Sequence, residues 1–321
     1  MNHLRNLIAG LVTVLAAGCS ISVDGAAIPA GSGYRANIDD ETRQALADRD
    51  RVRRIDPCGL LDQAAVTAAV GPPRFTGPGI DADECEIRFD PSTRINYVGV
   101  SMSVSAVGDG GTKFQVGDRT AYTLDGGDLC HISLTYDDNR AFFYAISGNS
   151  DQLCHKLRQI VIASAPLLDN PPQRADSTTM PDTTSWKLDP CTGLTAAFAP
   201  GQTFDFLGLN PFECDVYAGE YDSDNPANRY TVRYINVSTG LARYVADEDR
   251  RLRIVGVDAT ESSGDNEYCQ IKIFVGADHT FPVMNHDGVT EQWLETIHVT
   301  GHGCAETRQI AVAAVKAHKN R

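Results

Sequence analysis

The sequence is short of basic residues. Its 28 lysines and arginines stand against 42 aspartates and glutamates, which gives a formal net charge of −14 at pH 7. Nucleic acids and anionic headgroups both attract proteins that carry basic surfaces. The composition therefore argues against nucleic acid as a partner and against broad contact with anionic lipid headgroups. Solubility is sufficient to explain the acidity.

Familiar catalytic motifs are also missing. The sequence has no Gly-x-Ser-x-Gly, Ser-x-x-Lys, His-Glu-x-x-His or phosphate-binding glycine motif. We therefore expect a non-catalytic protein without a cofactor; the alternative is an envelope hydrolase or transferase whose site is assembled from scattered residues. His298, His302 and Cys304 carry atoms that could bind zinc, but Cys304 belongs to a repeated cysteine pattern, so no metal site is predicted.

The apolar run at the N-terminus is short. Arg5 precedes an apolar run from Leu7 to Ala17, and small residues lead to Cys19. This run is shorter than the roughly 20 residues of a spanning helix, and the pattern is that of a secretory signal over residues 1–18. Its end resembles the lipobox of bacterial lipoproteins, which implies that Cys19 carries lipid and anchors the protein to the outer face of the cell membrane.

Eight further cysteines follow Cys19. Outside the cytosol an even set is read first as disulfides, so we expect no free thiol among them. Four lie in each half of the chain: Cys58, Cys85, Cys130 and Cys154, then Cys191, Cys214, Cys269 and Cys304.

The sequences around these cysteines recur in the same order. "IDPCGLLD" at 55–62 returns as "LDPCTGL" at 188–194, "CEIRF" corresponds to "CDVYA", and "CHKLRQIVIASA" corresponds to "CAETRQIAVAAV". Aligned blocks in one order indicate an internal repeat. The sequence therefore predicts two copies of one module, at residues 52–168 and 185–321, joined by a linker at 169–184.

Each copy is expected to have an α+β fold. Asp-Pro pairs at 56–57 and 189–190 are typical of a helix start, and a second helix follows the last cysteine of each copy. Alternating segments such as "NYVGVSMSVSAV" and "YTVRYINVS" predict strands between them. Without crossover helices the sheet should be mostly antiparallel, with both helices packed on one face.

Four cysteines per module permit three pairings. Their order favours first with second and third with fourth, because these pairs tie each terminal helix to a strand. Upstream, residues 19–51 are predicted to be a lipidated tether followed by a charged helix, "IDDETRQALADRDRVRRI" from residue 38, with acids first and arginines last. Because this helix lacks a wide apolar face, it is expected to be a solvated spacer; the alternative is a helix that packs against a partner.

This arrangement of a lipobox, a "DPC" string and four cysteines resembles the actinobacterial lipoproteins grouped as DUF3558. It is more distantly similar to the disulfide-bonded extracellular sensor domains of mycobacterial serine/threonine kinases. The resemblance implies an envelope location and a disulfide-bonded architecture, with no catalytic residues to assign. We expect a binding or scaffolding module for an envelope protein, a lipid or a glycan.

One segment of the second copy has no counterpart in the first. The interval from Cys269 to Cys304 is longer than that from Cys130 to Cys154, and the excess falls in "GADHTFPVMNHDGVTEQW". Apolar anchors mixed with polar groups are suited to recognition. The alternative is that the aromatic residues cover a sheet edge or pack against the other module. The candidate recognition residues are His279, Phe281, Met284, His286, Asp287 and Trp293.

Overall fold

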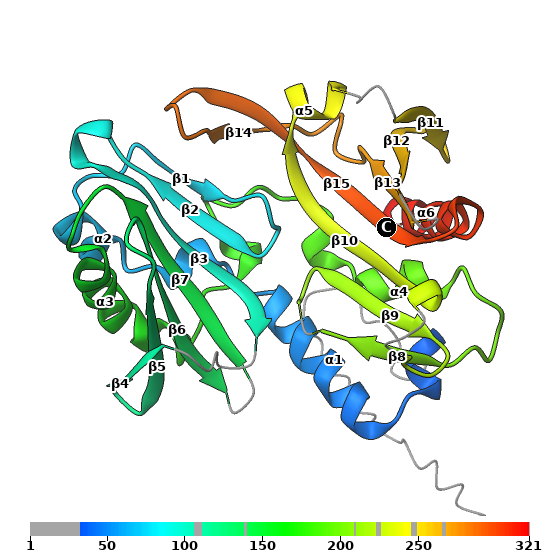
Figure 1. Cartoon of the computed structure of the whole chain (residues 1–321), viewed down its shortest axis with the longest axis horizontal. Helices are drawn as coiled ribbons and strands as arrows, with labels where there is room; N and C mark the ends of the chain where they lie inside the picture. The colour runs from blue at the N-terminus through cyan, green and yellow to red at the C-terminus, as the bar shows by residue number, and fades with distance from the viewer. Residues whose placement is uncertain are drawn as a thin grey trace, which may run out of the picture.

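The computed structural model describes residues 33–105, 111–137, 140–208, 210–222, 226–244, 249–264 and 268–320, which form two sheets with helices around them (Figure 1). The predicted signal peptide 1–18, Cys19 and the following residues up to 32 lie outside these ranges. Within them, no helix combines the length and the apolar character that crossing a bilayer requires. The predicted mixture of helices with mostly antiparallel sheets is confirmed.

The first sheet has seven strands in the order β1-β2-β3-β7-β6-β5-β4. Alternation along β3 explains its two faces, because Val98 and Val100 are buried on the side of the helices whereas Ser101 lies on the open side. The strands are β1 (Phe75–Pro78), β2 (Glu84–Arg88), β3 (Ile95–Ser105), β4 (Thr112–Val116), β5 (Arg119–Asp125), β6 (Leu129–Asp137) and β7 (Arg140–Gly148).

The second sheet has eight strands in the order β11-β12-β13-β15-β10-β9-β8, and β14 pairs with β15 beside this path. Every pair of named strands in both sheets is antiparallel. The strands are β8 (Phe204–Leu207), β9 (Glu213–Ala218), β10 (Arg229–Ser238), β11 (Arg250–Ile254), β12 (Val257–Ser263), β13 (Tyr268–Ile273), β14 (Phe281–Met284) and β15 (Thr290–His302).

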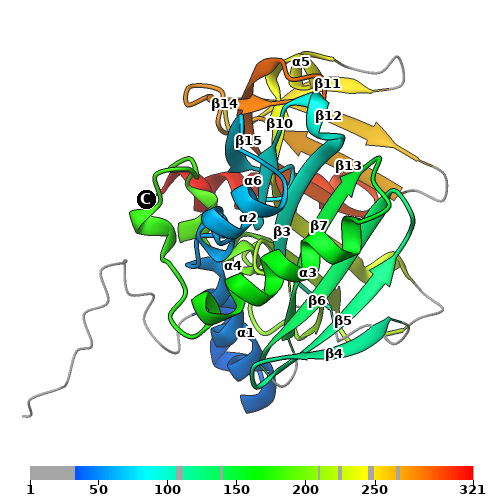
Figure 2. The same ribbon diagram turned by 90° about the vertical axis from the view of Figure 1, so that its left-hand side faces the viewer.

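Helices cover one face of each sheet. Helices α2 and α3 lie on the first sheet (Figure 2), and α4 and α6 pack against each other and on the second. The helices are α1 (Asp40–Arg53), α2 (Gln63–Ala69), α3 (Leu153–Ser164), α4 (Pro190–Thr195), α5 (Thr239–Arg243) and α6 (Cys304–Lys319). Short 3₁₀ turns are η1 (Gly33–Asn37), η2 (Cys58–Leu60), η3 (Pro91–Thr93), η4 (Ala165–Leu168), η5 (Arg174–Asp176), η6 (Ser185–Lys187) and η7 (Pro226–Asn228).

Four disulfides join these layers, each within one half of the chain. They have the pairs that the order of the cysteines favours: Cys58–Cys85, Cys130–Cys154, Cys191–Cys214 and Cys269–Cys304. The first and third connect the turn or helix after an Asp-Pro pair to β2 or β9. The other two connect β6 or β13 to the first turn of α3 or α6. Each covering helical element is therefore tied to the sheet beneath it.

The helix predicted to begin at Asp56-Pro57 starts later. Asp56 accepts a hydrogen bond from the Cys58 amide at 2.9 Å, but only the 3₁₀ turn η2 follows. The α-helix begins at Gln63, where Asp62 accepts from the Ala65 amide at 2.7 Å. Asp62 provides a second N-cap, and the helix begins there because the preceding Leu60 and Leu61 are buried in a segment that is not α-helical.

We expect Asp62→Ala to lower the free energy of unfolding by about 1 kcal/mol, because the first turn of α2 loses its cap. Urea denaturation measures the change, and Asp62→Asn, which can still cap, should recover most of it. An unchanged midpoint for Asp62→Ala would contradict a helix start at Gln63.

Helix α1 is present as predicted, but the prediction of a solvated spacer is wrong. Leu46 and Val52 are buried, and so are Arg49 and Arg53, which are 2% and 4% exposed. Arg53 Nε donates to the Pro211 carbonyl oxygen at 2.6 Å, and Arg49 Nη1 donates to that of Glu213 at 2.9 Å. The buried face of α1 is built from arginine stems that reach backbone acceptors of the second half, which a search for apolar residues overlooks.

The two halves also meet along β10. Strand β9 pairs with β10 only as far as Arg233, so β9 leaves the following residues of this edge of β10 unpaired. The loop between β1 and β2 occupies it: the Asn236 amide donates to the Ile80 carbonyl oxygen at 2.7 Å, and Arg233 pairs with Asp81 at 2.5 Å. The predicted linker 169–184 is packed as well, with Arg174 only 5% exposed.

Candidate functional site

The segment that is longer in the second half forms a hairpin and one wall of a pocket. After β13 the chain passes close to β15, where a Cβ on Gly276 would lie 2.6 Å from the Glu295 nitrogen. It then forms β14, turns over residues 285–289 and returns as β15. The Gly276 amide donates to the Glu295 carbonyl oxygen at 2.9 Å, which fixes the approach.

The candidate recognition residues separate into four places. Phe281, 8% exposed, lies opposite the half-buried Trp293 in the β14–β15 ladder, so these aromatic residues pack within the hairpin. His286 and Asp287 are exposed in its turn, 3.4 Å apart. Met284 is half-buried at the end of β14, and the exposed His279 precedes that strand. Strand β14 also contacts β1, as the alternative of packing against the other module expects.

A pocket of about 540 Å³ lies beside this hairpin, on the face of the second sheet opposite α6. Its apolar floor includes Phe274 and Leu294, which belong to a small cluster with Ile235 and Val237 separate from the main core. The lining residues are Thr239, Ala242, Arg243, Arg251, Leu252, Arg253, Asp258, Ala259, Thr260, Phe274, Ala277, Thr280 and Leu294. The pocket thus has an apolar base and polar walls, the usual character of a small-molecule site.

The rim of this pocket is basic. Arg253 pairs with Asp258 at 3.2 Å. Arg251 donates to the carbonyl oxygen of Arg243 at 3.3 Å, and no carboxylate of the described residues pairs with Arg243 or Arg251. Two exposed guanidinium groups are therefore available to an anion at the edge of an apolar surface.

Further basic side chains lie next to the pocket on the same face of the second sheet. His298 lies between Lys272 and Arg233 in the strand register. Burial, together with these two cations, lowers the pKa of His298 to about 3, so its ring is neutral at neutral pH. Arg233 is itself paired with Asp81 and Glu213. The positive potential on this face therefore comes from Lys272 and from the rim arginines, and it favours a negatively charged ligand.

A larger hollow, of about 880 Å³, lies beside α1 and is a weaker candidate. Most of its charges are already paired: Arg119 is 2.7 Å from Asp169, and Arg51 is within 3.6 Å of Asp48 and Asp137, although no carboxylate of the described residues pairs with Arg54. These ion pairs leave little unsatisfied charge to attract a ligand.

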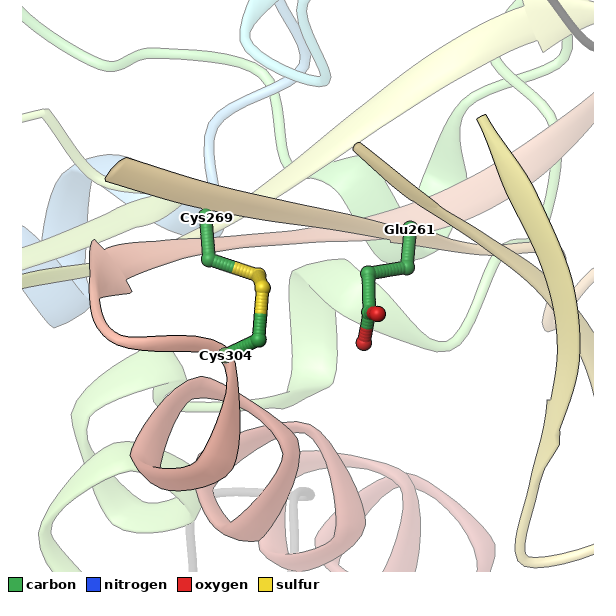
Figure 3. A group of neighbouring side chains, drawn as sticks. All are labelled: Glu261, Cys269 and Cys304. Carbon is green, nitrogen blue, oxygen red and sulfur yellow. A yellow bond between two sulfur atoms is a disulfide. The ribbon is translucent and has the colours of Figure 1, made fainter. Parts of the chain in front are cut away.

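One group of side chains, two cysteines and a glutamate, has the atom types of a metal site. Glu261 lies beside the Cys269–Cys304 disulfide (Figure 3). The sulfurs are bonded to each other, and the carboxylate accepts two hydrogen bonds from Arg308 at 2.5 and 2.7 Å. This grouping is an ion pair against a disulfide, and its ligand atoms are committed to those bonds.

The pocket itself was not predicted from the sequence, because five separate segments contribute to it. The extra length between Cys269 and Cys304 was the usable signal, and it led to the hairpin and its neighbour Thr280. No protein-family model, curated protein or solved structure matches the chain.

Proposed function

We propose that this chain is a lipid-anchored protein of the bacterial cell envelope that binds an anionic amphiphile, without catalysis, in the pocket beneath α5. The observation that carries the proposal is the combination of Phe274 and Leu294 at the base with Arg243 and Arg251 at the rim. An acyl chain or other apolar group would lie on the base, and its acidic head would meet the guanidinium groups.

The compartment supports this proposal. Four disulfides indicate an oxidising, extracytoplasmic environment. The signal pattern before Cys19 is consistent with export to this compartment and with a lipid anchor on Cys19. In Figure 1 the chain enters the described part at the bottom, at η1 and α1, whereas α5 and β14 lie at the top. The pocket therefore lies far from the point at which the described part of the chain begins.

The architecture supports descent from a repeated, DUF3558-like module. Read position by position, the order β1-β2-β3-β7-β6-β5-β4 matches β8-β9-β10-β15-β13-β12-β11. Each half has its disulfides at corresponding strands. Equivalent residues of the two copies can have different contacts: Arg308 bonds Glu261, whereas Arg158 of the first half lies 4.2 Å from the centroid of the Phe114 ring. Such differences between the copies are where a function specific to one copy would arise. Helix α5 and the segment before the hairpin, with Ala277 and Thr280, line the pocket and belong to the second half.

Fluorescence titration with 1-anilinonaphthalene-8-sulfonate, followed by displacement with dodecanoate, tests the pocket. We expect Arg243→Glu with Arg251→Glu to weaken dodecanoate binding at least tenfold, about 1.4 kcal/mol, because the head loses two charge-assisted contacts. Lys113→Glu, which makes the same kind of change on the exposed strand β4, is the matched control and should bind as the wild type does.

Shortening the ligand from dodecanoate to octanoate should also weaken binding, because less apolar surface is buried on Phe274 and Leu294. Equal affinity for dodecanoate and dodecanol, or retention of binding in the double arginine variant, would contradict an anionic amphiphile as the ligand.

A further inference from the structure

A second pocket, of about 350 Å³, lies on the open face of the first sheet. It is formed by neighbouring strands β2, β3, β6 and β7, away from the helices α2 and α3. The lining residues are Glu84, Cys85, Glu86, Tyr97, Gly99, Val100, Ser101, His131, Phe143 and Ala145. Carboxylates and aromatic rings predominate among its larger side chains.

The second half shows what occupies the corresponding position there. Glu213 on β9 lies opposite Arg233 on β10 in the strand register, and their side chains pair at 3.4 Å. In the first half, Glu84 on β2 lies opposite Ser101 on β3. Each glutamate directly precedes the strand cysteine of a disulfide, Cys214 or Cys85. The first half therefore has the carboxylate and lacks the guanidinium.

Removal of that cation leaves Glu84 poorly compensated. Its Oε2 accepts from the Asp81 amide at 3.2 Å, and among the described residues no cation pairs with it. Burial, reinforced by Asp81 and Asp83, raises the pKa of Glu84 to about 8. A half-buried carboxylate in this state gains much from a positive charge placed beside it.

Asp83 adds to the same deficit. It is fully buried; Oδ2 accepts from Ser101 Oγ at 3.0 Å, whereas Oδ1 has no hydrogen-bond partner in the described part of the chain. Ser101 lines the pocket, so this unsatisfied carboxylate lies directly behind the pocket wall. Burial and Asp81 raise the pKa of Asp83 to about 6.

We propose that this pocket binds the guanidinium group of a ligand, such as an arginine side chain of a protein partner, at the position that Arg233 fills in the second half. Glu84 would take the charge, and the ring of Phe143 would border its apolar stem. Glu86 and Tyr97 are not free for this role, because Arg88 already pairs with Glu86 and lies 5.3 Å from the centroid of the Tyr97 ring. The inference rests on strand register and does not depend on the other pocket.

The charged and titratable groups around Glu84 come from both halves. From the first half they are Asp81, Asp83, Glu86, Arg88, Tyr97 and His131, and from the second half Glu213 and Arg233. Burial lowers the pKa of His131, which disfavours the positively charged form of this ring. Of the cations, Arg88 is held by Glu86, and Arg233 is held by Asp81 and Glu213.

NMR titration of the full mature chain with ethylguanidine, against its neutral analogue ethylurea, tests the proposal. We expect ethylguanidine alone to shift signals of residues 84–86, 101 and 143–145. Its affinity should fall roughly 100-fold between pH 9 and pH 6, because Glu84 takes up a proton and each pH unit below its pKa costs a factor of ten. Equal shifts with ethylurea at pH 9, or no shifts, would overturn the inference.

Two variants separate binding from folding. Glu84→Gln should abolish ethylguanidine binding while leaving the fold intact, since it removes an uncompensated charge; Glu41→Gln on the exposed side of α1 is the matched control. Ser101→Arg supplies the missing guanidinium from the chain itself, and we expect it to exclude the probe and to raise the melting temperature. Retained binding in Glu84→Gln would contradict the proposed role of this carboxylate.

An arginine-containing tripeptide and free ethylguanidine distinguish the source of the group. Tighter binding of the tripeptide than of its citrulline analogue, through the same signals, supports a protein partner. If ethylguanidine binds but the tripeptide does not, the pocket takes only a small free cation, and the inference of a protein partner is wrong.

Discussion

Asp189→Ala is expected to destabilise the protein by about 3–5 kcal/mol, because it leaves a buried arginine without its counter-charge. Asp189 is 3% exposed and caps α4. Its carboxylate accepts from Tyr34 Oη and Arg35 Nη2 at 2.6 Å each, and it lies 3.5 Å from Arg49 Nη2. The segment before the first half and the first helix of the second are held together at this point.

The pH dependence has a defined direction. Burial alone would raise the pKa of Asp189, but Arg49, Arg53 and Arg35 together lower it to about 2. A carboxyl whose pKa is depressed in the folded state stabilises the protein above its ordinary pKa, and this stabilisation is lost as the pH falls towards 2. The wild type should therefore lose more stability between pH 4 and pH 2 than Asp189→Ala does.

Urea denaturation at several pH values provides both measurements. Asp40→Ala is the matched control, because Asp40 also pairs with an arginine, Arg43, but its side chain is 99% exposed. We expect little change from this substitution. Equal effects of the two substitutions would show that the Asp189 cluster does not fix the halves to each other.

Replacing Cys58 and Cys85 together by alanine is the second change with a large expected effect. The bridge closes a sequence separation of 27 residues, for which the loss of chain constraint is about 3–4 kcal/mol. Both cysteines are buried, and Met180 Sδ lies 3.3 Å from Cys58 Sγ, so lost packing adds to this value.

The pair Cys130 and Cys154 is the natural comparison. Its sequence separation of 24 residues is similar, but Cys154 is only half-buried. Thermal and urea unfolding of both double variants should show the larger loss for Cys58 and Cys85. A smaller loss for Cys58 and Cys85 than for Cys130 and Cys154 would mean that the packing of Cys58 against Met180 contributes nothing to stability.

Spacing of cysteines and alternation of apolar residues were sufficient to predict the class of fold. The strand around Val98 and Val100 and the helix after Cys304 follow from local pattern, which chemistry within a few residues determines. The start of α2 was mistaken because two aspartates, Asp56 and Asp62, can both cap, and only the packing of the intervening leucines decides between them.

Burial of charged residues was the part that local pattern could not supply. Arg49 and Arg53 look solvated in a helix without an apolar stripe, and their acceptors lie more than 150 residues away in the chain, at Glu213 and Pro211. The pocket beneath α5 likewise depends on distant segments meeting. The uncompensated Glu84 could have been found by aligning "DECEIR" with "FECDVY" and noting that Ser101 stands where the second copy has Arg233.

Native mass spectrometry of the full-length protein, released from its membrane in mild detergent, tests the central proposal most directly. We predict that the wild type carries one anionic amphiphile per chain in addition to the lipid on Cys19, and that Arg243→Glu with Arg251→Glu carries the Cys19 lipid alone. Identical masses for the two proteins, after allowance for the substitutions, would contradict the proposed ligand site.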